Sequence, residues 1–188
     1  MQADGIVGDK PLRLLAGRSL LAHVIDRIAP QVEAMAINAN GDPARFASFG
    51  LEVVADEVSD YHGPLAGVLA GMRWAASRGF SLVLSVPTDT PFLPEDLVAR
   101  LVEARETASA KIACAASGGR THPVVGLWPV GLADMLEADL RGGMRKVERW
   151  TAQHGAALAG FGIEGGDPFF NVNTPEDLAQ AEKMLRNP

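Results

Sequence analysis

The chain has 188 residues and a formal net charge of −6, and 47% of its residues are hydrophobic while 21% are charged. This length and balance are typical of one soluble domain with a substantial core, so we expect residues 1–188 to form a single domain. The acidic balance argues against broad binding of nucleic acid, which needs a basic surface. The acidic balance does not exclude binding of a nucleotide, because a nucleotide needs only a few local cations or a metal.

Several features narrow the class of protein further. Cys114 is the only cysteine, which excludes an intrachain disulfide and a cysteine-based zinc site. No apolar run reaches the roughly 20 residues of a membrane span, so no membrane partner is expected. The opening segment from Met1 to Lys10 is polar and does not resemble a signal peptide. We therefore expect a cytoplasmic enzyme.

The hydrophobic pattern predicts helices and strands in alternation. Ser19 is expected to cap a helix that runs to about Ile28, where apolar residues recur at helical spacing and Pro30 ends the pattern. Further helices are expected at 43–49, 64–77, 94–107, 132–140, 144–154 and from 174 onward. Strands are expected at 33–38, 51–55, 82–86, 111–116, 122–128, 157–163 and 169–172.

This alternation predicts an α/β fold. Strands that alternate with helices form a mainly parallel sheet with helices on both faces, which is a three-layer α/β/α, Rossmann-like architecture with a mixed sheet. The strands at 111–116 and 122–128 are the exception. The turn between them is too short for a crossover helix, so these two strands must be antiparallel.

The stretch from Leu82 to Pro94 is the most informative part of the chain. It begins as an apolar run, typical of a strand buried on both faces, and then breaks at Pro87 and places Asp89 just beyond the strand end. Ligands of open α/β sheets bind outside the carboxyl ends of the strands. Asp89 is therefore a candidate metal ligand; the alternative is a residue that only caps a proline-rich turn.

Polar residues at other predicted strand ends and loops join this candidate. With Asp89, the residues Lys10, Asn38 and Asp56 form the kind of set that handles a nucleoside triphosphate. A carboxylate can hold Mg²⁺ together with phosphate oxygens and water, and a lysine supplies a point charge for phosphate. The alternatives are that Asn38 and Asp56 form turns and that Lys10 is a solvated surface residue.

Taken together, these motifs resemble the MobA-type molybdenum cofactor guanylyltransferases, which have a nucleotidyltransferase fold. The matching segments occur in the family's order over nearly the whole chain. They are Gly8-Asp9-Lys10-Pro11-Leu12, Asn38-Ala39-Asn40, Val54-Ala55-Asp56, Gly63-Pro64-Leu65-Ala66-Gly67, Pro87-Thr88-Asp89-Thr90-Pro91-Phe92-Leu93-Pro94, His122-Pro123-Val124-Val125-Gly126-Leu127 and Phe170-Asn171-Val172-Asn173-Thr174-Pro175-Glu176-Asp177-Leu178.

The resemblance implies a reaction and a set of site residues. GTP and the molybdopterin cofactor would give the guanine dinucleotide cofactor and pyrophosphate, with Mg²⁺ as the metal. Lys10, Asn38, Asp56 and Asp89 would bind GTP, with Asn38 and Asp56 on the guanine and ribose side. Asp89 would also ligate Mg²⁺, and Lys10 and Asp89 would be the catalytic residues.

The resemblance also implies an acceptor side and partners. Asn171 and Asn173 would face the phosphate of the pterin, whose terminal oxygen would attack the α-phosphorus in line. No covalent enzyme intermediate would be needed. The implied partner proteins are molybdoenzymes or other proteins of cofactor biosynthesis.

The chain departs from the family pattern at its start. The family opens with an apolar strand and a Leu-Ala-Gly-Gly loop that ends in Arg-Met-Gly, whereas Met1 here falls inside that loop and Gln2 to Gly8 matches it poorly. A sheet without its inner strand would leave an apolar slot and unpaired backbone groups. We therefore expect that the given chain binds GTP weakly or not at all, and that adding the upstream residues restores binding. Equally tight binding of GTP and Mg²⁺ by both chains would contradict this expectation.

Two other functions remain open on the sequence. The first is a related nucleotidyltransferase that uses CTP or a sugar phosphate, and turnover with GTP against CTP separates it from a guanylyltransferase. The second is a non-catalytic partner that binds the cofactor, which the incomplete phosphate loop favours. The carboxylate of Asp89, placed between two prolines, argues against this second function.

Overall fold

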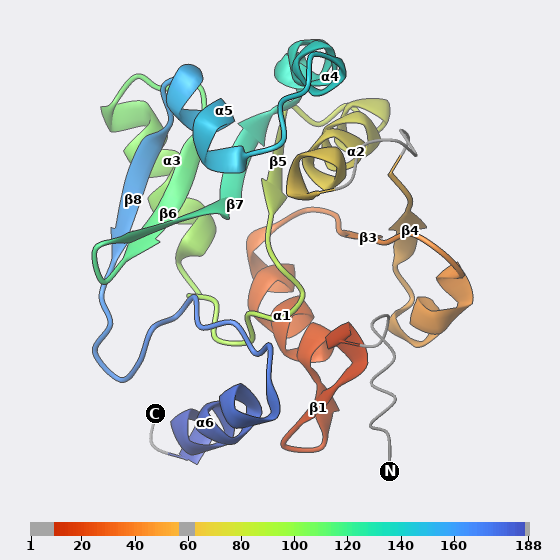
Figure 1. The fold of residues 1–188 in the computed structure, drawn as a ribbon, viewed down its shortest axis with the longest axis vertical. Helices are drawn as coiled ribbons and strands as arrows, with labels where there is room; N and C mark the ends of the chain where they lie inside the picture. The colour runs from red at the N-terminus through yellow and green to blue at the C-terminus, as the bar shows by residue number, and fades with distance from the viewer. Residues whose placement is uncertain (1–9, 57–62, 187–188) are drawn as a thin grey trace.

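The computed structural model describes residues 10–56 and 63–186, so Gly8 and Asp9 of the first motif lie outside the described residues. Helices and strands alternate along most of the chain (Figure 1). The α-helices are α1 (Leu20–Ile28), α2 (Pro64–Ser77), α3 (Leu97–Thr107), α4 (Ala133–Arg141), α5 (Val147–Gln153) and α6 (Pro175–Arg186). The strands are β1 (Leu14–Leu15), β2 (Arg18–Ser19), β3 (Ala36–Asn38), β4 (Glu52–Val54), β5 (Leu82–Ser85), β6 (Ala113–Ser117), β7 (Arg120–Pro129) and β8 (Ala157–Phe161). Short 3₁₀ helices are η1 (Lys10–Leu12), η2 (Ala29–Gln31), η3 (Pro43–Phe49) and η4 (Val130–Leu132).

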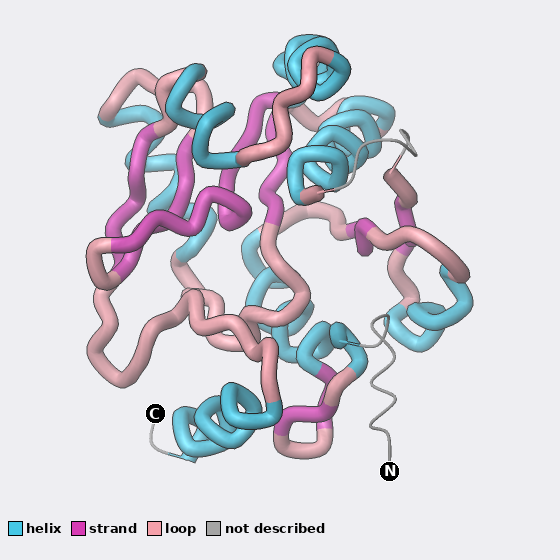
Figure 2. Tube along the Cα trace, in the orientation of Figure 1, coloured by secondary structure: helices cyan, strands magenta, loops and turns pink. Residues whose placement is uncertain are grey.

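The largest sheet has four strands in the order β5-β7-β6-β8 (Figure 2). Strand β7 is antiparallel to β5 and β6, and β6 is parallel to β8, so three of the four strands point the same way. The β6–β7 pair confirms the predicted antiparallel connection. The mixed sheet, with helices around it, confirms the predicted α/β, Rossmann-like class.

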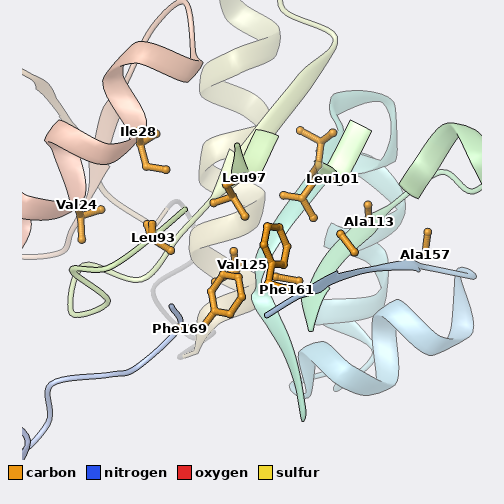
Figure 3. Packing of buried hydrophobic residues seen from close by; sticks show 13 residues of the cluster. Val24, Ile28, Leu93, Leu97, Leu101, Ala113, Val125, Ala157, Phe161 and Phe169 are labelled. Carbon is orange, nitrogen blue, oxygen red and sulfur yellow. The ribbon is translucent and has the colours of Figure 1, made fainter. Parts of the chain in front are cut away.

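Helices cover both faces of this sheet, and the side chains of β6 show why. Ala113 and Ala115 point into a core formed with α1 and α3, which Figure 3 shows from close by. Cys114, between them, points to the opposite face and packs with residues of α2, α4 and α5. Successive residues of a strand point to opposite faces, so one strand supplies two cores. The three-layer arrangement follows from this alternation.

Local sequence signals fix the ends of the helices. The hydroxyl of Ser19 accepts the N–H of Ala22 at 3.1 Å, which caps α1 as predicted. Pro64 is the first residue of α2, where a proline costs no hydrogen bond. The third helix begins at Leu97, three residues later than predicted, because Pro94 and the two residues after it form a turn.

A separate two-stranded parallel sheet, β3–β4, lies beside the large sheet without pairing to it. An apolar cavity of about 520 Å³ lies between β3, β5, α1 and α2. One expectation is corrected here: the residues of β5 are only half-buried, not buried on both faces, because β5 borders this cavity.

The segment 169–172 and the lengths of the helices bear on two further expectations. The strand predicted at 169–172 is wrong: this segment is a loop, and the N–H of Val172 donates to the carbonyl of Asp89 at 2.9 Å instead of joining a ladder. Within the described residues, no helix combines the length and apolar character that crossing a membrane requires. The single domain over residues 1–188 stays a prediction.

Candidate active site

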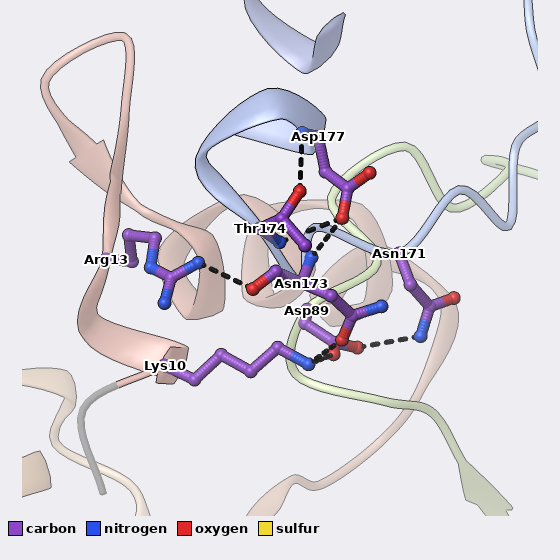
Figure 4. Close-up of polar contacts among 7 residues, drawn as sticks. All are labelled: Lys10, Arg13, Asp89, Asn171, Asn173, Thr174 and Asp177. Carbon is purple, nitrogen blue, oxygen red and sulfur yellow. Dashed lines mark hydrogen bonds and ion pairs between the residues drawn. The ribbon is translucent and has the colours of Figure 1, made fainter. Parts of the chain in front are cut away.

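Lys10 and Asp89 form an ion pair at the carboxyl end of β5 (Figure 4). Lys10 begins the 3₁₀ helix η1, which is anchored because Leu12 packs against the cluster around Ile37. Asp89 lies in the turn after β5 and is 8% exposed. Burying a carboxylate is costly unless a partner compensates its charge, and Lys10 is that partner. The structure therefore brings together the two residues predicted to be catalytic.

The loop 171–173 passes directly over this pair. Asn171 Nδ2 donates to Asp89 Oδ1 at 3.1 Å, and the ammonium of Lys10 donates to Asn173 Oδ1. Arg13 Nη1 donates to the carbonyl oxygen of Asn173 at 2.9 Å. Both asparagines predicted from the resemblance thus contact the Lys10–Asp89 pair, although they are more than 80 residues away in the sequence.

The start of helix α6 holds one end of this loop. Asp177 Oδ2 accepts the N–H groups of Asn173 at 2.9 Å and Thr174 at 2.8 Å, and the Asp177 N–H donates to Thr174 Oγ1 at 3.1 Å. This reciprocal cap satisfies the free donors of the first turn. The backbone donors, chiefly the N–H of Thr174, hold the pKa of the Asp177 carboxyl below its ordinary value.

The other end of the loop is held by Asp167. Its Oδ1 accepts the hydroxyl of Ser117 at 2.8 Å and the N–H of Phe169 at 3.0 Å, and its Oδ2 accepts Arg120 at 2.8 Å. Burial opposes ionisation of Asp167, but these three donors outweigh it and the pKa of its carboxyl is lowered. The segment from Asp167 to Asp177 is therefore fixed at both ends.

The histidine of the His-Pro-Val motif belongs to this same anchor. His122 Nε2 lies 2.8 Å from the Ser117 hydroxyl, and its ring lies 4.6 Å from the ring of Phe169. Ser117 gives its proton to the carboxylate of Asp167, which can only accept, so His122 Nε2 donates to Ser117. Burial lowers the pKa of His122. His122 is thus a structural residue here, and among the described residues no hydrogen bond, ion pair or ring contact links it to a predicted site residue.

A second polar group lies at the carboxyl ends of β3 and β4. Asn38 Nδ2 donates to Asp56 Oδ1 at 3.0 Å, and Asn40 Nδ2 donates to Asp56 Oδ2 at 2.8 Å. The N–H of Asp56 returns a bond to Asn40 Oδ1 at 2.9 Å. Both carboxylate oxygens of Asp56 are therefore fixed in direction. Asn38 and Asp56, predicted to act together, are in direct contact.

Helix α2 packs closely against this group through a glycine. A Cβ placed on Gly67 would overlap the Oδ1 atom of Asn38, so only glycine leaves room for that side chain. Among the described residues, no hydrogen bond or ion pair connects Asn38 or Asp56 with Lys10 or Asp89. The site therefore has two groups, which border opposite walls of the apolar cavity at Asn38 and Thr88.

The donor set of the Lys10–Asp89 group fits a hard cation. The described residues contain no cluster of three or more acidic, histidine or cysteine side chains that could hold a metal. Mg²⁺ needs no such cluster, since it is usually bound through one or two carboxylates while phosphates and water complete its shell. The hydroxyl of Thr90, next to Asp89, is buried and has no hydrogen-bond partner among the described residues.

Three residues of the site were missed by sequence reasoning. Arg13 follows Lys10 by three positions, and a 3₁₀ helix places such residues on one face, which is a signal for its role. Asn40 belongs to a matched motif, but nothing in its spacing indicated the contact with Asp56. Gly67 belongs to another matched motif, and no local signal in the sequence indicates its close approach to Asn38.

Comparisons with known proteins agree with this geometry. The family model described as "MobA-like NTP transferase domain" matches residues 3–157. The chain is 57% identical over 180 residues to a protein of Rhodopseudomonas palustris (strain BisB5) named molybdenum cofactor guanylyltransferase, covering 94% of this chain and 86% of that protein. It is 54% identical to a protein of the same name from Bradyrhizobium sp. (strain ORS 278), covering 94% and 85%.

Solved structures show the same fold. The chain is similar to a crystal structure of molybdopterin-guanine dinucleotide biosynthesis protein A from Archaeoglobus fulgidus, with a TM-score of 0.70 at 22% identity, covering 95% of this chain and 91% of that one. It is also similar to 4-diphosphocytidyl-2C-methyl-D-erythritol synthase from Anaerococcus prevotii, with a TM-score of 0.74 at 14% identity, covering 93% and 91%.

Proposed function

The chain belongs to the family of MobA-like NTP transferase domains and is a nucleotidyltransferase, and on that premise we propose that it transfers GMP from GTP to the terminal phosphate of the molybdopterin cofactor. The products are the guanine dinucleotide cofactor and pyrophosphate. One observation carries the proposal: Lys10, Asp89 and Asn173 converge at the carboxyl end of β5, in a chain 57% identical to a relative named molybdenum cofactor guanylyltransferase.

The group at the ends of β3 and β4 is proposed to bind the guanosine. Asp56 has both carboxylate oxygens oriented by Asn38 and Asn40, so its remaining lone pairs have fixed directions. A carboxylate oriented in this way can accept hydrogen bonds from the N–H groups of a base and the hydroxyl groups of a ribose. Because Asn38 and Thr88 both line the apolar cavity, we expect the nucleoside to lie beside the Lys10–Asp89 pair rather than on it.

The Lys10–Asp89 group is proposed to bind the triphosphate. Lys10 supplies a point charge for phosphate oxygens. The carboxylate of Asp89 is the proposed ligand of Mg²⁺, which when bound neutralises charge on the phosphates. With these groups in place, the chain's task is to hold the α-phosphorus and the attacking oxygen in line. The transfer needs no covalent intermediate on the protein.

The acceptor is proposed to bind on the side of Asn171 and Asn173. Both residues belong to the loop 171–173, in which Asn171 donates to Asp89. The segment that contains this loop is held by Asp167 and Asp177. A loop fixed at both ends can present its amide groups to a phosphate without losing much conformational freedom. Molybdoenzymes and other proteins of cofactor biosynthesis as partners, and the cytoplasmic location, stay predictions.

The experiment that tests this proposal is a transfer assay. Purified chain is mixed with GTP, Mg²⁺ and molybdenum-loaded molybdopterin, and the dinucleotide and pyrophosphate are measured; CTP replaces GTP in a parallel reaction. We expect product with GTP at a rate at least about tenfold above that with CTP. Faster turnover with CTP, or no turnover with either nucleotide, would overturn the proposal.

The Asp89→Ala variant tests the role of the carboxylate in the same assay. We expect a loss of roughly 10³-fold or more in transfer, because preorganised electrostatic groups of this kind account for most of the stabilisation of phosphoryl transition states. Circular dichroism should show an unchanged fold, which separates loss of chemistry from loss of structure. Transfer that survives in Asp89→Ala would show that the metal assignment is wrong.

A further inference from the structure

Arg13 brings a positive charge to the loop 171–173 from the N-terminal part of the chain. Its Nη1 donates to the carbonyl oxygen of Asn173 at 2.9 Å, while Lys10, from the same turn, donates to the side chain of Asn173 (Figure 4). The backbone of Arg13 is fixed as well: its N–H donates to the carbonyl of Lys10 at 3.2 Å, and its carbonyl accepts the N–H of Leu20 at 2.9 Å. The structure therefore holds this guanidinium against the loop that we propose binds the acceptor.

Core packing joins the segment of Arg13 to the same loop. Leu15 precedes the turn of the hairpin that follows Arg13, and Leu20 begins helix α1 after it. Both leucines are fully buried in one cluster with Val172 of the loop. The position of Arg13 beside the loop 171–173 is therefore set by the core as well as by its hydrogen bond to the loop.

Most of the hydrogen-bonding capacity of Arg13 is unused. A guanidinium has five N–H donors in a planar fork and no acceptor. Among the described residues, the bond to Asn173 is the only hydrogen bond of this guanidinium, and no carboxylate pairs with it. Arg18, on the second strand of the hairpin, differs in this respect, because its Nη1 lies 2.6 Å from Oδ2 of Asp26. Arg13 is thus held by a neutral oxygen, which leaves its charge and its remaining donors available to an anion.

The acceptor in the proposed function, on which this inference rests, needs such a cation. A phosphate monoester carries a charge of about −1.5 to −2 near pH 7. The amides of Asn171 and Asn173 are neutral, the carboxylate of Asp89 repels a phosphate, and Lys10 is assigned to the triphosphate. As the dianion bonds to the α-phosphorus, the bond from that phosphorus to the pyrophosphate oxygen breaks and pyrophosphate leaves. The dianion has no proton to lose, so it needs a neighbouring cation rather than a base.

We propose that Arg13 binds the terminal phosphate of the acceptor through the guanidinium N–H groups that Asn173 leaves unused, and that it thereby selects acceptors that end in a phosphate monoester. Arginine suits this task because its planar fork matches two oxygens of one phosphate. The bond to the Asn173 carbonyl keeps the guanidinium beside the amide of the same residue. The charge and the amide are therefore placed to bind neighbouring oxygens of one phosphate. An acceptor without this phosphate leaves the charge unpartnered and binds weakly.

The first test uses inorganic phosphate as the probe and the full chain without nucleotide. In ¹⁵N-labelled protein, phosphate should shift the Nε–H signal of Arg13 and the side-chain amide signal of Asn173. Arg13→Gln should weaken phosphate binding about tenfold, because a charge-assisted hydrogen bond is lost. Arg18→Gln is the matched control and should weaken it less than about twofold, since Arg18 is exposed and already paired. Equal losses in the two variants, or an Arg13 signal that phosphate does not shift, would overturn the proposal.

Steady-state transfer kinetics separate binding of the acceptor from a purely structural role of Arg13. Arg13→Gln should raise KM for the molybdopterin cofactor about tenfold and change KM for GTP less than about twofold. Arg13→Lys keeps the charge but loses the fork, so it should raise KM for the cofactor only about threefold. Equal effects of the two variants, or a larger rise in KM for GTP, would overturn the proposal. Circular dichroism checks that each variant is folded.

The outcomes separate this inference from the proposed function. A response of Arg13 to phosphate in a chain that transfers no GMP would leave the phosphate site standing and remove the function. Transfer of GMP with an unchanged KM for the cofactor in Arg13→Gln, or with no response of Arg13 to phosphate, would leave the function standing and overturn the role of Arg13.

Discussion

The half of the molecule around β6 and β7 is packed differently from the half around β3 and β5. In the first half, the hydrogen-bonded strands β7, β6 and β8 lie between helices, and side chains such as Leu101 and Trp128 are fully buried. In the second half, the two-stranded β3–β4 sheet is separated from β5 by an apolar cavity of about 520 Å³. Close packing is the usual state of a protein interior, so we expect the second half to be the less stable one.

This difference matters because the candidate site borders the loosely packed half. Lys10, Asp89 and Asn173 lie at one end of β5, and Asn38 and Asp56 lie across the cavity from it. The well-packed half supplies the anchor of the loop through Ser117 and Asp167. The well-packed half thus supports the loop, while Asn38 and Thr88 of the candidate site line the cavity.

The largest expected effect is on stability, from two leucines that differ in burial. Leu101→Ala, in the fully packed core, should lower the free energy of unfolding by about 3 kcal/mol, as buried leucine truncations do. Leu84, on half-buried β5, packs against the same core but borders the cavity, so Leu84→Ala should lower it by only about 1 kcal/mol. Urea unfolding of both variants measures the two values. Equal losses would contradict looser packing beside the cavity.

The next effect concerns GTP binding and a pair of glycines on α2. Gly67→Ala should raise KM for GTP about tenfold, roughly 1.4 kcal/mol, because its Cβ displaces the Asn38 side chain from Asp56. Gly71→Ala is the control one turn later, where a Cβ would lie 3.6 Å from the nearest atom of Val83, an ordinary contact. Steady-state kinetics compare the variants. A matching rise in Gly71→Ala would mean that α2, and not Asn38, sets the affinity.

The smallest effect concerns the anchor of the loop and depends on pH. The pKa of Asp167 is lowered in the folded chain, so its ionised carboxylate stabilises the fold above the unfolded pKa and this contribution is lost as the pH falls through the folded value. Asp167→Asn should cost about 1 kcal/mol at neutral pH. Urea unfolding should show the cost shrinking as the pH falls through the folded pKa. A cost that is independent of pH would argue against the ionised anchor.

Much of the fold could be predicted from the sequence because its signals are local. Ser19 as a cap, Pro64 at the start of α2 and the short β6–β7 turn each act through neighbouring residues. The prediction of a strand at 169–172 failed for the opposite reason. The segment is apolar like a strand, but the N–H of Val172 donates to the carbonyl of Asp89, a distant contact that no local pattern records, while Asp167 accepts the N–H groups of Phe169 and Phe170 in a local turn.

The candidate site shows the same division. Asp89, Asn38 and Asp56 could be found because each ends or follows a predicted strand, and ligands of α/β sheets bind beyond the carboxyl ends of the strands. The contact of Lys10 with Asn173 joins residues 163 positions apart, and only the fold reveals it. The prediction that a chain extended by the family's apolar strand and Leu-Ala-Gly-Gly loop binds GTP more tightly stays a prediction.

The most direct test of the account is a crystal structure with Mn²⁺ and a GTP analogue that resists transfer, analysed by the anomalous signal of manganese. The account predicts one peak within about 2.3 Å of Oδ2 of Asp89 and on the side of Asn173, with the phosphates reaching Lys10 and the base directed toward Asn38 and Asp56. A manganese peak elsewhere, or a nucleotide bound away from the end of β5, would contradict the central claim that these segments form one nucleotide site.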